Sequence, residues 1–148
     1  MKRLTILLPL LLAALLLPAR EPVRVACIGN SITFGYLLND PATESYPSQL
    51  QEMLGEGYEV GNFGRSGATL LRHGHRPYVE QPEWRGALDF RPDIAVIHLG
   101  VNDTDPRNWL HYGDEFIGDY LAIIDTLRQQ NPDVRIILAN LTPIGAQH

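Results

Sequence analysis

The stretch VRVACIGNS, residues 23–31, is a largely apolar run that stops abruptly at Gly29-Asn30-Ser31. A short apolar run that ends in glycine is typical of a buried strand. Asn and Ser favour the turn that follows such a strand. Ser31 is therefore either an ordinary turn residue or a nucleophile placed at the end of a strand, and the neighbouring segments have to distinguish these two interpretations.

Downstream of this run, helix-like and strand-like segments alternate. Residues 58–64, 93–100 and 134–143 resemble further strands, whereas residues 45–54, 82–88 and 113–132 resemble helices. Apolar residues recur at helical spacing in each helix, in the sets Leu50, Met53 and Leu54; Trp84, Ala87 and Leu88; and Phe116, Tyr120, Ile123, Ile124 and Leu127. Such alternation predicts βαβ units and an α/β fold with a parallel sheet that helices cover on both faces.

The composition is that of one ordinary globular domain. The chain has 148 residues, 45% of them hydrophobic, and a net charge of -5. Its only lysine, Lys2, lies in a segment that we expect to be removed. No basic patch remains that could neutralise a phosphate backbone, so nucleic acid is not an expected partner.

Residues 1–20, MKRLTILLPLLLAALLLPAR, have the pattern of a secretory signal peptide. Lys2 and Arg3 precede an apolar core that is too short to span a bilayer comfortably, and Ala19 offers a small residue for cleavage. We therefore expect a secreted or periplasmic bacterial protein with no stable membrane insertion after cleavage. The imperfect cleavage site leaves an uncleaved membrane anchor as the alternative. Cys27 is the only cysteine, so no intrachain disulfide can form, and its place in the first strand predicts a buried structural thiol.

Polar motifs follow three of the predicted strands. They are Gly29-Asn30-Ser31, the segment NFGRSG at residues 62–67, and Gly100-Val101-Asn102-Asp103. Ligands of parallel sheets bind outside the carboxyl ends of the strands, so these motifs are expected on one rim. Together they supply a hydroxyl, a backbone N–H at a glycine and a side-chain amide, which are the groups that acyl transfer requires.

These three blocks, CIGNSITFG, NFGRSGAT and LGVND, resemble those of the SGNH hydrolases, also called GDSL esterases, and occur in the same order. The resemblance implies that Ser31 is the nucleophile and that the Gly64 N–H and the Asn102 amide form the oxyanion hole. Asn30, Gly100 and Asp103 would support them. It also implies a flavodoxin-like three-layer α/β/α sandwich over residues 21–148. No cofactor or metal is expected, since the His73-x-His75 pair has no evident third ligand.

The chain departs from the family pattern in two ways. Asn30 stands where the family usually has aspartate, from which we expect a modified loop. The fourth block, an Asp-x-x-His that supplies the general base and its orienting acid, has no match in this chain. We therefore expect a C-terminally truncated domain without its last strand and helix, inactive by itself because serine is a weak nucleophile without a base.

The chain's own histidines are not expected to replace that base. His73 and His75 are expected to be solvated loop residues, and His98 a hydrogen-bonded core residue. His111 is expected in the loop before the long helix, and His148 is terminal. Asp103 and Asp105 are expected to solvate a loop or cap a helix. Arg65, Arg72 and Arg76 lie near the presumed cleft and could pair with an anionic substrate, although surface arginines are usually only solvated.

The sequence of residues 31–71 most resembles those of bacterial carbohydrate O-acetylesterases, among them sialate O-acetylesterase and acetylxylan esterase-like members. The expected substrate is therefore a small-molecule or carbohydrate ester. A lysophospholipase or thioesterase of the same superfamily is one alternative, although the polar loop at residues 36–45 does not suggest a long apolar groove. A non-catalytic carbohydrate-binding or interaction protein on the same scaffold is the other.

Overall fold

The computed structural model describes residues 21–141. The predicted signal peptide, the end of the predicted fourth strand and His148 lie outside the described residues. The strands are β1 (Val23–Gly29), β2 (Tyr58–Gly64), β3 (Ile94–His98) and β4 (Arg135–Leu138). The α-helices are α2 (Ser31–Phe34), α3 (Pro41–Glu44), α4 (Tyr46–Leu54), α5 (Pro82–Asp89), α6 (Pro106–Tyr112) and α7 (Phe116–Gln130). Short 3₁₀ turns occupy Gly55–Gly57, Tyr78–Glu80, Asn102–Thr104 and Gly113–Glu115.

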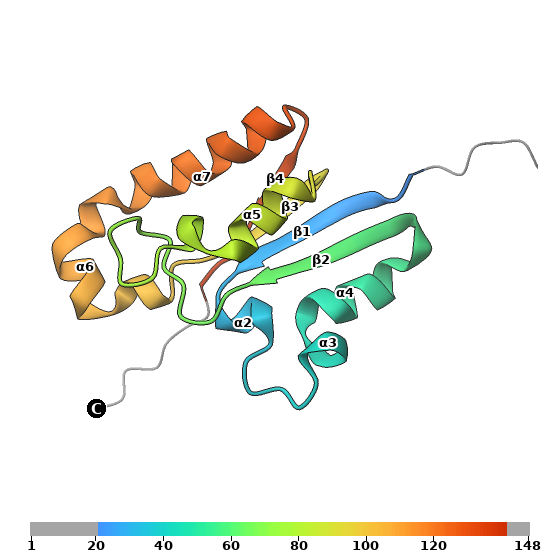
Figure 1. Ribbon diagram of the computed structural model, residues 1–148, viewed down its shortest axis with the longest axis horizontal. Helices are drawn as coiled ribbons and strands as arrows, with labels where there is room; N and C mark the ends of the chain where they lie inside the picture. The colour runs from blue at the N-terminus through green and yellow to red at the C-terminus, as the bar shows by residue number, and fades with distance from the viewer. Residues whose placement is uncertain (1–20, 142–148) are drawn as a thin grey trace, which may run out of the picture.

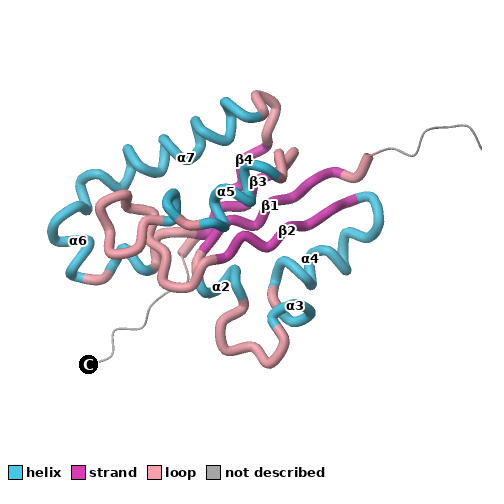
Figure 2. The backbone as a smooth tube through the Cα atoms, viewed as in Figure 1, coloured by secondary structure: helices cyan, strands magenta, loops and turns pink. Residues whose placement is uncertain are grey.

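The four strands form one parallel sheet in the order β2-β1-β3-β4. Gly29 lies opposite Gly64 on one side and His98 on the other, so β1, β2 and β3 end at the same level. Figure 2 shows the loops that follow these strands gathered at one end of the sheet. The predicted rim therefore exists, and all three polar motifs lie on it.

Helices cover both faces of the sheet, which confirms the predicted three-layer architecture (Figure 1). On one face, alternate residues of β1 and β3 pack against α5 and α7; the buried set includes Ala26, Ile28, Ala95, Ile97, Trp84, Ala87, Ile123 and Leu127. On the other face, Cys27 is fully buried beside Tyr46 of α4. Burial raises the pKa of the Cys27 thiol to about 11, so this cysteine is the inert structural thiol that we predicted.

The long helix α7 follows its sequence pattern closely. Ile123 and Leu127 are 1% exposed, and Phe116, Tyr120 and Ile124 pack around them. The helix ends at Gln130 because Asn131 is already extended, with Pro132 directly after it. No helix within residues 21–141 has the length and apolar character needed to cross a bilayer.

Three predicted details are wrong. Met53 is 83% exposed, so it does not belong to the core face of α4. His111 lies in α6 rather than in a loop, because Asp105 caps this unpredicted helix and Pro106 starts it. The fourth strand ends at Leu138 rather than continuing to residue 143, and its residues Ile137 and Leu138 are 41% and 53% exposed. Within residues 21–141, β4 is therefore an edge strand with apolar side chains facing solvent.

Candidate active site

Ser31 is the first residue of α2 and follows β1 after one intervening residue. Asn30 caps this short helix: it is fully buried, and its Oδ1 accepts a hydrogen bond of 3.0 Å from the Ile32 N–H. The Asn30 Nδ2 is buried without a hydrogen-bond partner among the described residues. The cap holds Ser31 at the strand end, where its own N–H has no acceptor within the helix.

Gly64, the predicted oxyanion donor, has a different role. A Cβ at this position would lie 2.1 Å from the Phe34 N and 2.6 Å from the Thr33 carbonyl carbon. Glycine is therefore required for the close approach between β2 and α2. The Gly64 N–H already donates a hydrogen bond of 3.0 Å to Asn62 Oδ1. This donor is therefore already engaged at the end of β2.

Gly67 takes the place beside Ser31 that we predicted for Gly64. Ser31, Tyr36, Ser66, Gly67 and Arg76 line an open depression of about 310 Å³ at the rim. The Gly67 N–H has no hydrogen-bond partner in the part of the chain that the structure describes. Gly67 has a φ of 77°, which only glycine adopts readily. The block NFGRSG contains two glycines, and the choice between them required the packing of Gly64 on α2.

Asn102 does not line this depression, but it is bonded to the loop that contributes Gly67 to it. Its Nδ2 donates a hydrogen bond of 2.8 Å to the carbonyl of Ala68, the residue after Gly67. An amide has two N–H groups, so one remains available. Gly100 supports this arrangement with a φ of 120°, which turns the chain from β3 into the loop that carries Asn102.

Asp103 joins the second and third blocks. Its carboxylate is fully buried and accepts hydrogen bonds from the N–H groups of Leu70 at 2.9 Å and Leu71 at 2.7 Å. Burial raises the pKa of Asp103, and these two hydrogen bonds oppose the shift. The predicted loop solvation or helix capping is therefore wrong for Asp103. It is correct for Asp105, which caps α6 through the Arg107 N–H at 2.9 Å and whose pKa Arg107 lowers to about 2.

Asn108 of α6 is a site-supporting residue that the sequence analysis missed. It is 1% exposed, and its Nδ2 donates a hydrogen bond of 2.9 Å to the Asn102 carbonyl. Its Oδ1 accepts a hydrogen bond of 2.9 Å from the His75 N–H. Asn108 thus fixes the backbone of Asn102 to the loop after β2. Its only sequence signal was an asparagine in an apparently polar segment.

None of the described histidines lines the depression with Ser31. His73 Nδ1 lies 2.7 Å from Glu115 Oε2, and this contact raises the pKa of His73. His75 bonds to Asn108, so neither loop histidine is merely solvated as predicted. His98 is 7% exposed, which confirms its predicted core position. The predicted hydrogen bond to its ring is absent among residues 21–141.

The three arginines near the cleft differ in their partners. Arg65 pairs with Glu83 at 3.1 Å, and Arg72 lies 3.7 Å from the Asp119 carboxylate. Arg76 instead donates a hydrogen bond of 2.9 Å from Nη1 to the Ser66 carbonyl and lines the depression. Of the three, Arg76 alone borders Ser31.

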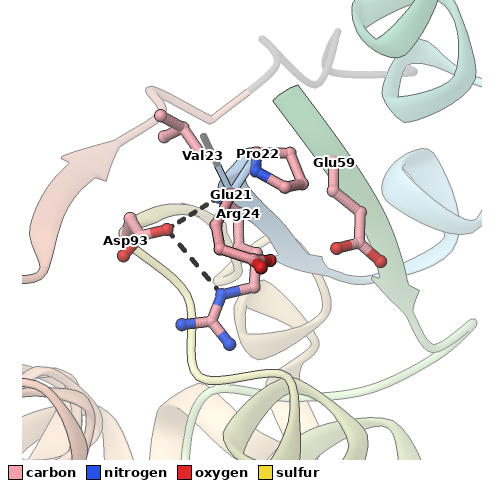
Figure 3. A pocket seen from close by; sticks show the side chains of 6 residues that line it. All are labelled: Glu21, Pro22, Val23, Arg24, Glu59 and Asp93. Carbon is pink, nitrogen blue, oxygen red and sulfur yellow. Dashed lines mark hydrogen bonds and ion pairs between the residues drawn. The ribbon is translucent and has the colours of Figure 1, made fainter. Parts of the chain in front are cut away.

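A larger hollow of about 570 Å³ lies at the opposite end of the sheet, where β1 and β2 begin (Figure 3). Its charged residues are Glu21, Arg24, Glu59 and Asp93, and Arg24 is bonded to Asp93. It contains no hydroxyl nucleophile, and it faces the amino ends of the strands rather than the carboxyl ends where ligands of such sheets bind. The smaller depression at Ser31 is therefore the better candidate site. No cluster that could hold a metal ion occurs in residues 21–141.

Comparisons with known proteins show which family the chain resembles. Residues 27–148 match the GDSL-like lipase/acylhydrolase family. An acetylxylan esterase from Xylanibacter ruminicola is 50% identical over 111 residues, which cover 75% of this chain and 23% of that protein. The chain thus spans about a quarter of the length of this curated relative.

Solved structures share the fold. A family two carbohydrate esterase from Clostridium thermocellum, solved with cellohexaose, superposes with a TM-score of 0.64 at 22% identity, over 88% of this chain and 47% of that one. AlinE4, an SGNH-hydrolase family esterase, superposes with a TM-score of 0.57 at 22% identity, over 84% of this chain and 63% of that one. Because the family match extends over residues 27–148, the chain belongs to the GDSL-like lipase/acylhydrolase (SGNH) family.

Proposed function

We propose that this protein is a secreted serine esterase that removes O-acetyl groups from carbohydrates, with Ser31 as the nucleophile. The observation that carries this proposal is the depression at the rim. There the Ser31 hydroxyl shares an open surface with Gly67, whose N–H is unpaired among the described residues. Family membership supplies the reaction class, and the acetylxylan esterase relative favours an acetyl group on a sugar.

In the proposed reaction, the Ser31 Oγ attacks the ester carbonyl carbon while its proton passes to a base. The carbonyl oxygen takes the electron pair and becomes negative. It then accepts hydrogen bonds from the N–H groups of Ser31 and Gly67 and from the Asn102 amide. Collapse of this intermediate expels the sugar hydroxyl and leaves an acetyl-serine, which water hydrolyses. These donors are held in place before the substrate arrives, so the developing charge needs no reorganisation.

The base for Ser31 is not among the described residues that line the depression, which are Tyr36, Ser66, Gly67 and Arg76. His73 and His75 lie on the loop after β2, where His73 contacts Glu115 and His75 contacts Asn108. We expect the base to be a histidine of an Asp-x-x-His block, as the family resemblance implies. Export through residues 1–20 stays part of the proposal, since a polysaccharide substrate would lie outside the cytoplasm.

The test is a comparison of Ser31→Ala with Ser66→Ala in the full-length protein. Both serines border the depression, but the Ser66 Oγ is buried and out of reach of a substrate. Ser31→Ala should abolish acetate release from p-nitrophenyl acetate and from acetylated xylo-oligosaccharide, with an unchanged circular dichroism spectrum. Ser66→Ala should keep most of the activity. Normal turnover by Ser31→Ala would reject the proposal. Sugar binding without turnover by the unmodified protein would instead support the non-catalytic alternative.

A second candidate function is the hydrolysis of esters with longer acyl chains. It is favoured by an apolar hollow of about 200 Å³ beside the third block, lined by Gly100, Thr104, Trp109, Phe116 and Leu141. A series of p-nitrophenyl esters from acetate to octanoate separates the two candidates. A kcat/KM that falls steeply beyond acetate supports the acetylesterase, whereas a rise toward octanoate supports the lysophospholipase or thioesterase alternative.

A further inference from the structure

Arg76 places a positive charge beside the proposed nucleophile. It lines the depression together with Ser31 and Tyr36. Its guanidinium lies over Gly67: a Cβ at Gly67 would be 3.4 Å from Nη1 and 3.9 Å from Cζ. The Nη1 hydrogen bond of 2.9 Å to the Ser66 carbonyl holds it there. The guanidinium is thus tethered to the loop that carries the proposed oxyanion donor.

This tether leaves the other edge of the guanidinium available. Nη1 binds a neutral carbonyl, while Nε and Nη2 form the planar pair that binds a carboxylate with two parallel hydrogen bonds. No carboxylate of residues 21–141 forms an ion pair with Arg76, and no acidic residue lines the depression. Arg65 and Arg72 on the same loop are each neutralised by an acid.

The rest of the depression suits a sugar ring. Tyr36 is 62% exposed and offers an aromatic surface next to Ser31. An aromatic face with a polar neighbour binds a partly apolar ring while its hydroxyls stay solvated. The depression therefore combines a ring-binding face, a hydroxyl nucleophile and one uncompensated cation.

Building on the proposed esterase function, we infer that Arg76 selects acidic substrates, namely O-acetylated saccharides that carry a carboxylate, such as uronic acids. The carboxylate binds Nε and Nη2 of Arg76 while the acetyl group lies at Ser31. A neutral acetylated sugar is hydrolysed by the same machinery without this contact. The preference is therefore a property of Arg76 and not of the oxyanion hole.

The experiment uses two monosaccharide acetates that differ only at C6. One is the O-acetylated methyl glycoside of galacturonic acid, which has a free carboxylate. The other is the corresponding methyl galactoside, which has a hydroxymethyl group. The full-length protein should prefer the uronate, and 0.5 M NaCl should reduce that preference. Arg76→Gln should lower kcat/KM for the uronate about 10- to 100-fold, the usual effect of losing a hydrogen bond to a charged group. The same variant loses the Nη1 hydrogen bond to the Ser66 carbonyl, so kcat/KM for the galactoside should fall as well, but by a clearly smaller factor.

Two matched variants complete the test. Arg85→Gln removes an equal charge from the exposed face of α5. It should leave kcat/KM unchanged for both substrates. Arg76→Lys keeps the charge without the planar pair and should recover only part of the preference. An equal loss on both substrates in Arg76→Gln, or an original preference for the galactoside, would overturn the inference.

Binding measurements keep this inference separate from the proposed function. Calorimetric titration of Ser31→Ala with the uronate and with the galactoside requires no turnover. Tighter binding of the uronate that disappears in Ser31→Ala/Arg76→Gln supports the role of Arg76, even if Ser31 proves not to be the nucleophile. Equal binding of the two sugars refutes it, even if the protein is an acetylesterase.

Discussion

The replacement of Asp103 by alanine should destabilise the protein more than any other loss of a single surface or loop carboxylate. Its carboxylate is the acceptor for two buried N–H groups, those of Leu70 and Leu71. Each donor left unpaired costs about 1–3 kcal/mol, which sums to about 2–6 kcal/mol. Removing a carboxylate that is costly to bury returns part of this energy, so we expect the lower half of the range. With a urea slope of about 2 kcal/mol per M, the unfolding midpoint should fall by about 1–2 M.

The pH dependence of this loss has a definite sign. The pKa of Asp103 is raised above its ordinary value of 3.8, mainly by burial. The folded state therefore binds the carboxyl proton of Asp103 more tightly than the unfolded state does. The contribution of Asp103 to the free energy of unfolding is for this reason greatest below pH about 4. It falls as the pH rises through the raised pKa. The stability gap between the unmodified protein and Asp103→Ala should narrow over this window.

Urea denaturation at several pH values, followed by circular dichroism, measures both effects. Asp105→Ala is the matched control, since Asp105 is only two residues away but caps α6 at the surface, and its loss should be clearly smaller. Asp103→Asn keeps one acceptor and turns an amide N–H toward the other donor. Its unfolding midpoint should therefore lie between those of Asp103→Ala and Asp105→Ala. Equal midpoints for Asp103→Ala and Asp105→Ala would refute the reasoning. A gap that widens toward neutral pH would show that the hydrogen bonds outweigh the burial of the charge.

Three further predictions concern other parts of the rim. Gly64→Ala should sharply lower the melting temperature, because its Cβ would lie 2.1 Å from the backbone of α2. Gly57→Ala is the control and should be tolerated, because its Cβ would have nothing within 4 Å. Similar melting temperatures for the two variants would contradict the packing argument. Asn102→Ala should lower kcat by about 10²- to 10³-fold with little change in KM, as expected for a donor that acts mainly in the transition state, and a change in KM alone would indicate simple substrate binding. The pKa of His73, measured by NMR titration, should lie above 6.5 and fall toward it in Glu115→Gln. Because the folded-state pKa is raised, the stabilisation by this pair is complete below pH about 6.5 and is lost as the pH rises through the raised pKa; an unchanged titration in Glu115→Gln would exclude the pairing.

Local patterns in the sequence determined the architecture and the position of Ser31. The apolar run at residues 23–29 and the stripe on residues 116–127 reflect periodicities that the backbone itself imposes, so strand and helix could be recognised without knowing their partners. The strand–helix alternation then implied a parallel sheet, and a parallel sheet places all strand ends on one rim. For this reason the sequence alone predicts Ser31 and Asn102 at the same edge.

Tertiary packing decided which polar groups at that edge are used and which are free. Gly64 and Gly67 are three residues apart in one motif. Only the tertiary structure shows that Gly64 packs against the backbone of α2, whereas Gly67 lines the depression beside Ser31. Asp103 and Asn108 find their partners about thirty residues away in sequence, at Leu70, Leu71 and His75, so no local pattern could distinguish them from solvated loop residues. The same holds for charge. Arg65, Arg72 and Arg76 look alike in the sequence, but the acids that neutralise the first two are brought to them by α5 and α7, and none of the described acids is brought to the third. A polar side chain acquires its role from the groups that folding places around it, and those groups come from distant parts of the chain.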